Sequence, residues 1–379
     1  MRRLSIALSL VTMLAAAGGS AHGGPTAGGW ASDNVEYVGF VPFEVGTATG
    51  ASLFGKYMVV TGWKTWSIYD ISEPASPQLL STTPFGFAFE NEDVATNGEI
   101  MLFSEEAPRS VLHVWDIEDK SNPVEVATIE GAGNHTATCV YECRYSYGSD
   151  GAIVDLRNPA KAKLVGDWKK KLGIPFKVHD VDEFRPGYLV TSAYEGPIQL
   201  LDVRDPVHPR LVVSAAPPKI EPEAAKAGAG VHATRWPHDG NDRWLMAQGG
   251  SNIAQAQCND GTRNFWTFDA SRWESDGALV LRDEFVVGNG SPSDGRYPLS
   301  TCSTHWFDVH PGFRDGGLVT LAYYDNGTRF LKVTESGRIK EVGWFLPYAG
   351  VTSSPYWVTD ELVYAIDYSR GLDILRFNP

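Results

Sequence analysis

The chain has 379 residues, of which 46 are acidic and 32 basic, and its formal net charge is −14. So acidic a surface repels the phosphate backbone of nucleic acids and anionic lipid headgroups, which argues against nucleic acid and membrane surfaces as partners. The length exceeds that of one ordinary hydrophobic core but suits an architecture that repeats the same packing unit.

The N-terminus has the pattern of a secretory signal peptide. Two arginines precede an apolar run over residues 4–17, and a stretch of small residues ends at Ala21. We expect cleavage after Ala21, which removes residues 1–21 and delivers the protein to the extracellular space or the periplasm. The apolar run is too short to span a bilayer, and no later segment reaches the ~20 apolar residues that a span needs. The Gly- and Ala-rich residues 22–34 are expected to form a flexible lead-in.

Seven copies of a repeat follow. Each copy ends an alternating apolar strand and opens a turn rich in Asp, Asn, Pro or Gly, which is typical of β-strands joined by tight turns. The copies are WSIYDISEPASP (66–77), LHVWDIEDKSNP (112–123), GAIVDLRNPAKA (151–162), IQLLDVRDPVHP (198–209), FWTFDASRW (265–273), TRFLKVTESG (328–337) and LDILRFNP (372–379). They recur at intervals of 39 to 67 residues, and ~40–50 residues is what a four-stranded propeller blade requires. We therefore predict an all-β fold, a seven-bladed β-propeller over residues 35–379.

An N-terminal strand is predicted to close the last blade. Residues 35–43 resemble the fourth strands of other copies, whereas the sequence ends after the third strand of the seventh copy. Pairing these strands removes two exposed edges that would otherwise invite aggregation. The phrase Asp-hydrophobic-x-x-Pro after an apolar strand resembles the LVIVD-repeat family of seven-bladed propellers. This resemblance implies the fold and little about activity, because propellers host many unrelated functions.

Four histidines occupy one position in four consecutive copies: His135, His179, His232 and His305. Each opens a first strand, and first strands lie nearest the axis of a propeller, so the four side chains are expected to converge at one mouth of the central channel. Imidazole is a ligand for Zn, Cu, Fe and Ni. The pattern predicts a transition-metal site for copper or iron, with zinc as a further candidate. The alternative is that the four side chains are polar caps that hydrogen-bond to neighbouring blades.

Glu92 fills the same position in the second copy, where EDV aligns with HDV. It is the predicted catalytic residue, acting on protons as a general base, although a fifth ligand and a partner that orients an imidazole remain open as roles. The first copy offers Ala51 or a neighbour at this position, and the seventh offers Ser353 or Ser354.

Four cysteines in an exported protein predict two disulfide bonds, for which three pairings exist. Cys139 and Cys143 flank a short turn in the first hairpin of the third blade. Cys258 lies in an insertion between the second and third strands of the fifth blade, and Cys302 lies in the connection to the sixth blade, which opens on the same face. We predict the pairs Cys139–Cys143 and Cys258–Cys302. A cysteine-based metal site is the competing interpretation, but the spacings do not match a zinc ribbon or knuckle.

A four-histidine site on a seven-bladed propeller resembles the arrangement in carotenoid cleavage oxygenases, which use non-haem iron, and more loosely that in the selenium-binding and methanethiol oxidase family. The likeness is architectural and implies redox chemistry. We predict a metal-dependent oxidase or oxygenase that acts on a small, partly apolar molecule. Candidate aromatic walls of its pocket are Phe89, Trp236, Trp306 and Tyr356.

Two other functions remain open at this point. One is a non-catalytic binding scaffold that grips a protein or polysaccharide partner through the insertions 249–264 and 286–303. The other is a metal-dependent hydrolase that generates hydroxide from bound water.

Overall fold

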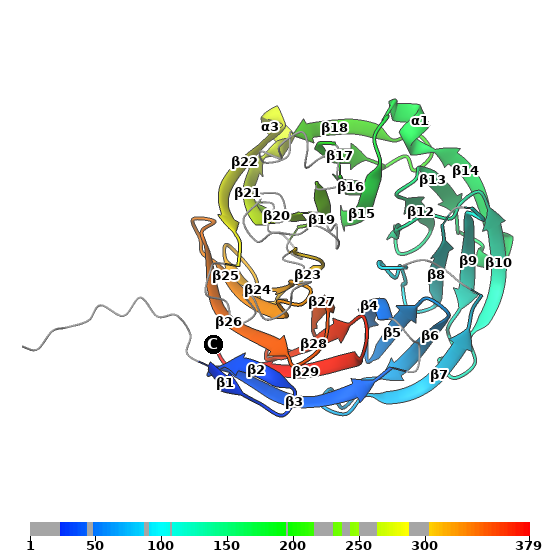
Figure 1. Ribbon diagram of the computed structural model, residues 1–379. Helices are drawn as coiled ribbons and strands as arrows, with labels where there is room; N and C mark the ends of the chain where they lie inside the picture. The colour runs from blue at the N-terminus through cyan, green and yellow to red at the C-terminus, as the bar shows by residue number, and fades with distance from the viewer. Residues whose placement is uncertain are drawn as a thin grey trace, which may run out of the picture.

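Seven antiparallel sheets stand around one axis (Figure 1), and the predicted all-β, seven-bladed propeller is confirmed. The computed structural model describes residues 23–43, 48–86, 91–106, 108–194, 196–215, 230–236, 243–249, 264–287 and 303–379.

Each blade holds the strands of one repeat, ordered from the axis outward. Blades 1 and 2 contain β4 (Ala48–Phe54), β5 (Tyr57–Gly62), β6 (Thr65–Asp70) and β7 (Gln78–Pro84), then β8 (Ile100–Glu105), β9 (Val111–Asp116) and β10 (Val124–Glu130). Blades 3 and 4 contain β11 (Ala137–Val140), β12 (Tyr145–Gly148), β13 (Ala152–Asp155) and β14 (Lys163–Asp167), then β15 (Val178–Arg185), β16 (Tyr188–Ala193), β17 (Ile198–Asp202) and β18 (Arg210–Ala215).

The remaining blades follow the same plan. Blades 5 and 6 contain β19 (Val231–Arg235), β20 (Trp244–Gly249), β21 (Phe265–Arg272) and β22 (Ala278–Phe285), then β23 (Phe307–Val309), β24 (Gly317–Ala322), β25 (Thr328–Val333) and β26 (Ile339–Pro347). Blade 7 contains β27 (Thr352–Trp357), β28 (Leu362–Asp367), β29 (Gly371–Phe377) and β3 (Val35–Pro42). The short helical segments are η1 (Pro159–Lys161), α1 (Trp168–Leu172) and α3 (Trp273–Asp276). Within the described ranges, no helix is long and apolar enough to cross a membrane.

The aspartate of the repeat ends the third strand by capping the turn that follows. The Oδ1 atom of Asp70 accepts a hydrogen bond from the backbone N–H of Ser72 at 2.8 Å, and Asp116, Asp202 and Asp269 accept equivalent bonds from the residue two positions later. Such a turn satisfies backbone donors that the strand leaves unpaired, which explains the choice of aspartate.

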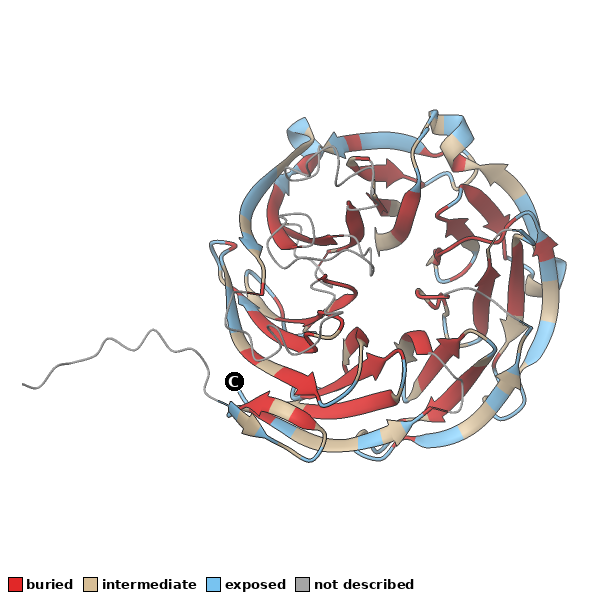
Figure 2. Ribbon diagram, in the orientation of Figure 1, coloured by how far each residue is buried: buried red, intermediate tan, exposed pale blue. Residues whose placement is uncertain are grey.

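The apolar core lies between neighbouring blades, and exposure increases outward. Figure 2 shows buried residues along the inner strands and exposed residues along the rim. At the junction of blades 7 and 1, Tyr364 and Ile374 pack in one cluster with Met58 and Val60. Each sheet is therefore covered on both faces, and the inner ends of the first strands are held at fixed positions around the axis.

The predicted closure of the ring is present. β3 pairs antiparallel with β29, with Leu375 opposite Tyr37, and Arg376 donates to Glu36 at 2.6 Å across the two strands. The N-terminal strand thus supplies the outermost strand of blade 7.

The flexible lead-in expected over residues 22–34 is corrected by the structure. β1 (Gly23–Pro25) pairs with β2 (Gly29–Ser32), and β2 adds to the outer edge of blade 6 by pairing with β26. The side chain of Asn34 donates to the carbonyl of Val342 at 2.9 Å, which anchors the turn before β3. Backbone pairing with an available sheet edge therefore orders a segment whose composition indicated a loose tail.

Candidate metal centre

The predicted histidines open the first strands of blades 3 to 6. His179 and His232 are the extra residues of β-bulges, because the pairing of β15 skips from Val178 to Asp180 and that of β19 skips from Val231 to Ala233. A bulge turns one side chain away from the regular alternation of a strand, and here it directs both imidazoles into the channel.

The same bulge occurs in blades 1 and 7, where the pairing skips Thr49 and Ser353. The first-blade position of the column is therefore Thr49 rather than the expected Ala51, and of the two candidates in blade 7 it is Ser353. Neither of these two side chains carries an imidazole, so the histidine set covers four of the seven blades.

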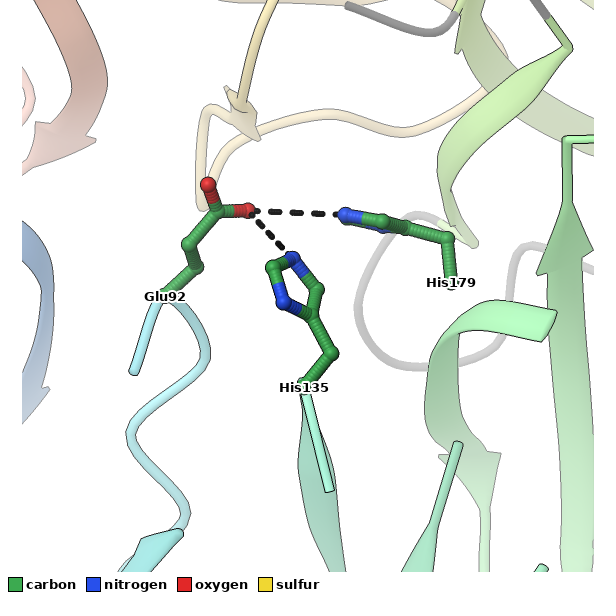
Figure 3. A group of neighbouring side chains, drawn as sticks. All are labelled: Glu92, His135 and His179. Atoms are coloured by element: carbon green, nitrogen blue, oxygen red, sulfur yellow. Dashed lines mark ion pairs between the residues drawn. The ribbon is translucent and has the colours of Figure 1, made fainter. Parts of the chain in front are cut away.

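The structure brings the Nε2 atoms of all four histidines to the carboxylate of Glu92. Figure 3 shows His135 and His179 pointing at this group from adjacent blades. Glu92 Oε2 lies 3.6 Å from Nε2 of His135, 3.6 Å from that of His179 and 3.5 Å from that of His232. Glu92 Oε1 lies 3.1 Å from Nε2 of His305. All five side chains are buried, with at most 8% of any residue exposed.

The Nδ1 atoms point the other way and are each occupied. Nδ1 of His179 donates to the carbonyl of His232 at 2.8 Å, and Nδ1 of His305 donates to that of Ser353 at 2.7 Å. Nδ1 of His135 bonds to the carboxylate of Glu106. These contacts run from one blade to the next, as the polar-cap alternative expects, but they account only for Nδ1.

Two Nε2 atoms have no hydrogen-bond partner in the described part of the chain. These are the Nε2 atoms of His179 and His232. Since a carbonyl oxygen only accepts, Nδ1 of His179 carries the proton, and Nε2 of the neutral ring presents a lone pair to the carboxylate. Burial and repulsion from the neighbouring imidazoles hold the pKa of both rings well below the ordinary value. Two buried acceptors, Nε2 of His179 and the carboxylate of Glu92, therefore face each other. A cation bound between them would remove the cost of leaving them unpaired.

His135 differs because it lies between two carboxylates. Burial lowers its pKa, but the hydrogen bonds to Glu106 and Glu92 outweigh burial and raise the pKa to about 10. Burial likewise raises the pKa of Glu92, and the opposing interactions with His305 and His135 bring it well below the ordinary value. Without an ion, Glu92 is thus an anion stabilised by a protonated His135.

Gln248 contacts the fourth imidazole. Its Nε2 atom lies 2.5 Å from Nδ1 of His232, so the amide donates and Nδ1 accepts, and its Oε1 atom accepts from the hydroxyl of Thr304 at 2.9 Å. That hydroxyl also lies 3.1 Å from the carbonyl of Gly249. In this orientation the proton of a neutral His232 ring lies on Nε2, and rotating the amide by 180° would leave a lone pair there, as in His179.

Glu92 is held in place by contacts of its own backbone and of Asn91 with blades 1 and 2. The carbonyl of Asn91 accepts a hydrogen bond from the Thr61 hydroxyl at 2.6 Å, and the side chain of Asn91 accepts from Ser104 N at 2.7 Å. A Cβ on Gly50 would lie 1.8 Å from the carbonyl oxygen of Glu92, so only glycine allows this approach. Trp306 donates from Nε1 to Glu92 Oε2 at 3.1 Å.

The distances from Glu92 to the four imidazoles suit ligand atoms of a transition-metal ion. Ligand atoms on an ion with bonds of about 2.1 Å lie roughly 3.0–3.4 Å apart when adjacent, close to the 3.1–3.6 Å between Glu92 and the imidazoles. Glu92 with His135 and His179, and Glu92 with His232 and His305, form two groups whose ligand atoms all lie within 4.8 Å of one another. The hydrogen bonds from Nδ1 of His179 and His305 to backbone carbonyls match the way metal-binding imidazoles are commonly oriented.

A layer of charged side chains lies further along the channel. The guanidinium of Arg235 lies 3.0 Å from Asp182, 3.8 Å from Asp180 and 3.9 Å from Asp93, and its centre is 5.3 Å from the ring of Trp306. Beyond it, a cavity of about 310 Å³ is lined by the far ends of β15 and β19. Arg235 thus lines this cavity and also contacts Trp306, which donates to Glu92.

Sequence reasoning missed the residues that follow the second strand of a blade. Glu106 follows β8, which precedes the repeat strand β9 and so corresponds to the second strands of the other blades. Tyr194 follows β16 and Tyr368 follows β28, and all three residues contact the histidine cluster. Their turns open on the same face as the first-strand starts. A second aligned column, at the ends of the second strands, is the signal that would have found them.

The remaining predicted residues have separate outcomes. The structure contains a disulfide bond between Cys139 and Cys143, whereas Cys258, Cys302 and Phe89 lie outside the described residues, so the second disulfide bond stays a prediction. Among the other expected pocket walls, Trp236 stacks on Phe184 between blades, with ring centroids 4.5 Å apart, and the Tyr356 hydroxyl accepts a hydrogen bond from Ala51 N at 3.1 Å.

Comparison with known proteins supports the fold. Residues 45–83 match the LVIVD repeat family, in agreement with the resemblance predicted from the sequence. No curated protein matches the chain. Among solved structures, the β-propeller domain of Cps50 (Swd1) from Myceliophteria thermophila is similar, with a TM-score of 0.58 and 15% identity over 89% of this chain and 99% of that domain. At this identity the likeness extends to the fold alone.

Proposed function

We propose that this LVIVD-repeat β-propeller is a metalloprotein that holds a transition-metal ion at one mouth of its channel. The ligands are His135, His179, His232 and His305, and Glu92 lies among them.

One observation carries this proposal. The Nε2 atoms of His179 and His232 are buried without a hydrogen-bond partner beside a carboxylate oxygen, and Nε2 of His179 is an acceptor, as that oxygen is. A buried polar group without a partner is unfavourable by about 1–3 kcal/mol. Hydrogen bonding between blades explains the Nδ1 atoms and leaves these Nε2 atoms unexplained, whereas a bound cation uses all of them.

The proposed activity is oxidation or oxygenation of a small, partly apolar molecule by bound copper or iron. Such an ion supplies one-electron chemistry, which the protein side chains lack. The aromatic rings of Tyr194 and Tyr324 lie 4.8 Å from those of His179 and His305, respectively, and provide apolar surface beside the cluster. Glu92 is placed to take or return a proton near the histidines.

The test begins with elemental analysis of the purified protein after metal supplementation. We expect close to one equivalent of copper or iron, together with oxygen uptake on at least one phenolic, thiol or polyene compound. Less than about a tenth of an equivalent of any transition metal contradicts the proposal, because a preorganised multi-histidine site retains its ion.

Other outcomes distinguish the remaining functions. Bound zinc with hydrolysis of an ester or amide favours the metal-dependent hydrolase, in which the ion activates water. Bound metal without turnover favours a binding scaffold for a protein or polysaccharide. We also propose export of the mature protein, which N-terminal sequencing checks by finding residue 22 at the amino terminus.

A further inference from the structure

We propose that the Tyr368 hydroxyl is a further ligand of this metal ion and binds it as a phenolate. The inference rests on the proposed function and extends it, because an anionic oxygen ligand determines which ion and which oxidation state the site favours.

The position of Tyr368 is fixed by the backbone. The residue directly follows β28, its N–H donates to the carbonyl of Val351 at 3.0 Å, and its carbonyl accepts from Ala48 N at 3.2 Å. The preceding Asp367 caps the turn by accepting from Ser369 N at 2.9 Å. Contacts to its own blade and to blade 1 therefore set where the side chain begins.

The ring direction is also constrained. The ring of Tyr368 stacks at 20° on that of Tyr324, with 6.1 Å between centroids, and lies 5.6 Å from the imidazole of His305. Only 9% of the residue is exposed. The hydroxyl consequently points into the cluster rather than to solvent.

Three donor atoms form a compact triangle at this point. The Tyr368 oxygen lies 3.2 Å from Glu92 Oε1 and 3.3 Å from His305 Nε2, and these two atoms are 3.1 Å apart. An ion about 2.1 Å from each of the three atoms would sit roughly 1 Å above their plane, with bond lengths normal for N and O ligands. The triangle therefore has the dimensions of one face of a coordination shell.

These three atoms are all available to one ion. Nδ1 of His305 donates to the carbonyl of Ser353, so Nε2 is the nitrogen available to a metal. The Tyr368 hydroxyl and the carboxylate of Glu92 both lie beside this nitrogen. An ion in the triangle would contact all three atoms.

Charge balance supports the same assignment. Burying a divalent ion among neutral imidazoles is unfavourable unless nearby anions compensate it. Glu92 and a Tyr368 phenolate supply two negative charges, which neutralise a divalent ion. On binding, the phenol O–H bond breaks, a metal–oxygen bond forms and the proton leaves to solvent, with no change in oxidation state. Anionic oxygen ligands favour Cu(II) or Fe(III) over Cu(I).

The experiment uses the colour of a phenolate bound to an oxidised metal. Full-length protein is loaded with Cu(II), its metal content is measured, and its visible and resonance Raman spectra are recorded. We expect a phenolate-to-metal charge-transfer band with tyrosine ring modes that shift when ring-deuterated tyrosine is incorporated. Protein loaded with Zn(II), which has a full d shell, should lack the band.

Two variants assign the band to a residue. Tyr368→Phe should bind copper with affinity lower by about 10-fold or more and lose the band. Tyr364→Phe is the matched control in the same blade, because its buried hydroxyl donates to the carbonyl of Pro74 at 2.6 Å, and it should keep the band.

Each result is decisive. If copper-loaded protein lacks the band, the phenolate inference is overturned but the proposed metal site is not. A band that persists in Tyr368→Phe has the same consequence. Protein that binds no metal overturns the proposed function itself. If Tyr368→Phe does not fold, a wild-type Raman spectrum that is insensitive to the deuterated tyrosine still overturns the phenolate assignment.

Discussion

Substituting His179 by asparagine separates the two nitrogen atoms of the imidazole. The asparagine side-chain nitrogen takes the place of Nδ1, so it can still donate to the carbonyl of His232, which lies 2.8 Å from Nδ1. The variant lacks only the far side of the ring, including the Nε2 atom 3.6 Å from Glu92. If His179 serves only as a cap between blades, His179→Asn should behave like the wild type.

The metal hypothesis gives a different magnitude. An ion at 100 times its dissociation constant stabilises the native state by about 2.7 kcal/mol. If losing one ligand weakens binding about 100-fold, the same ion concentration stabilises the variant by only about 0.4 kcal/mol. For a chain of this size each kcal/mol shifts the melting temperature by roughly 2 °C. Metal should therefore raise Tm by about 5 °C in the wild type and by less than about 1 °C in the variant.

The assay is thermal unfolding with and without metal at about 100 times the wild-type dissociation constant, combined with metal titration. His208→Asn is the control, because this side chain is 74% exposed and pairs with Asp205 in a turn; it should reproduce the wild-type shift. A wild-type metal response in His179→Asn would refute the reasoning that Nε2 is a ligand.

Three further predictions follow from the same geometry. Glu92→Gln should keep the fold and lower metal affinity by about 10–100-fold, whereas metal retained with turnover lost would assign Glu92 to proton transfer alone. Gly50→Ala places a Cβ 1.8 Å from the Glu92 carbonyl oxygen. It should lower the free energy of unfolding by about 1–3 kcal/mol and weaken metal binding. Gly39→Ala is its control, because a Cβ there would meet nothing within 4 Å, and it should change neither quantity. Deleting residues 22–43 removes β1, β2 and β3 and should lower Tm by about 10 °C or more; an unchanged Tm would contradict the closure by β3.

The repeat spacing was sufficient to predict the propeller, its closure and the convergence of four histidines. These features depend on which residues recur at equivalent positions, and that is visible in one sequence. The assignment of Thr49 was missed because a bulge adds a residue to one strand and shifts the column by an amount that periodicity does not show. The pairing of β2 with β26 was missed because it depends on a sheet edge contributed by residues far along the chain.

The partners of the histidines were harder to predict for a similar reason. Glu106, Gln248 and Tyr368 come from second strands and the turns after them, and their types differ from blade to blade. A column is recognisable only when one residue type repeats, as histidine does. Their proximity to the site follows from the topology of the blade, in which the second-strand end and the first-strand start share one face.

The closing strand also has a consequence for how the chain is made. β3 is synthesised long before its partner β29, because Glu36 and Arg376, which pair across this seam, are 340 residues apart. At a synthesis rate of about 5–20 residues per second, β3 waits roughly 20–70 s with an unpaired edge. During that interval, the β3 strand of one nascent chain can pair with a completed β29 from another copy. The seam that seals the finished ring is therefore the place where strand exchange between molecules would begin.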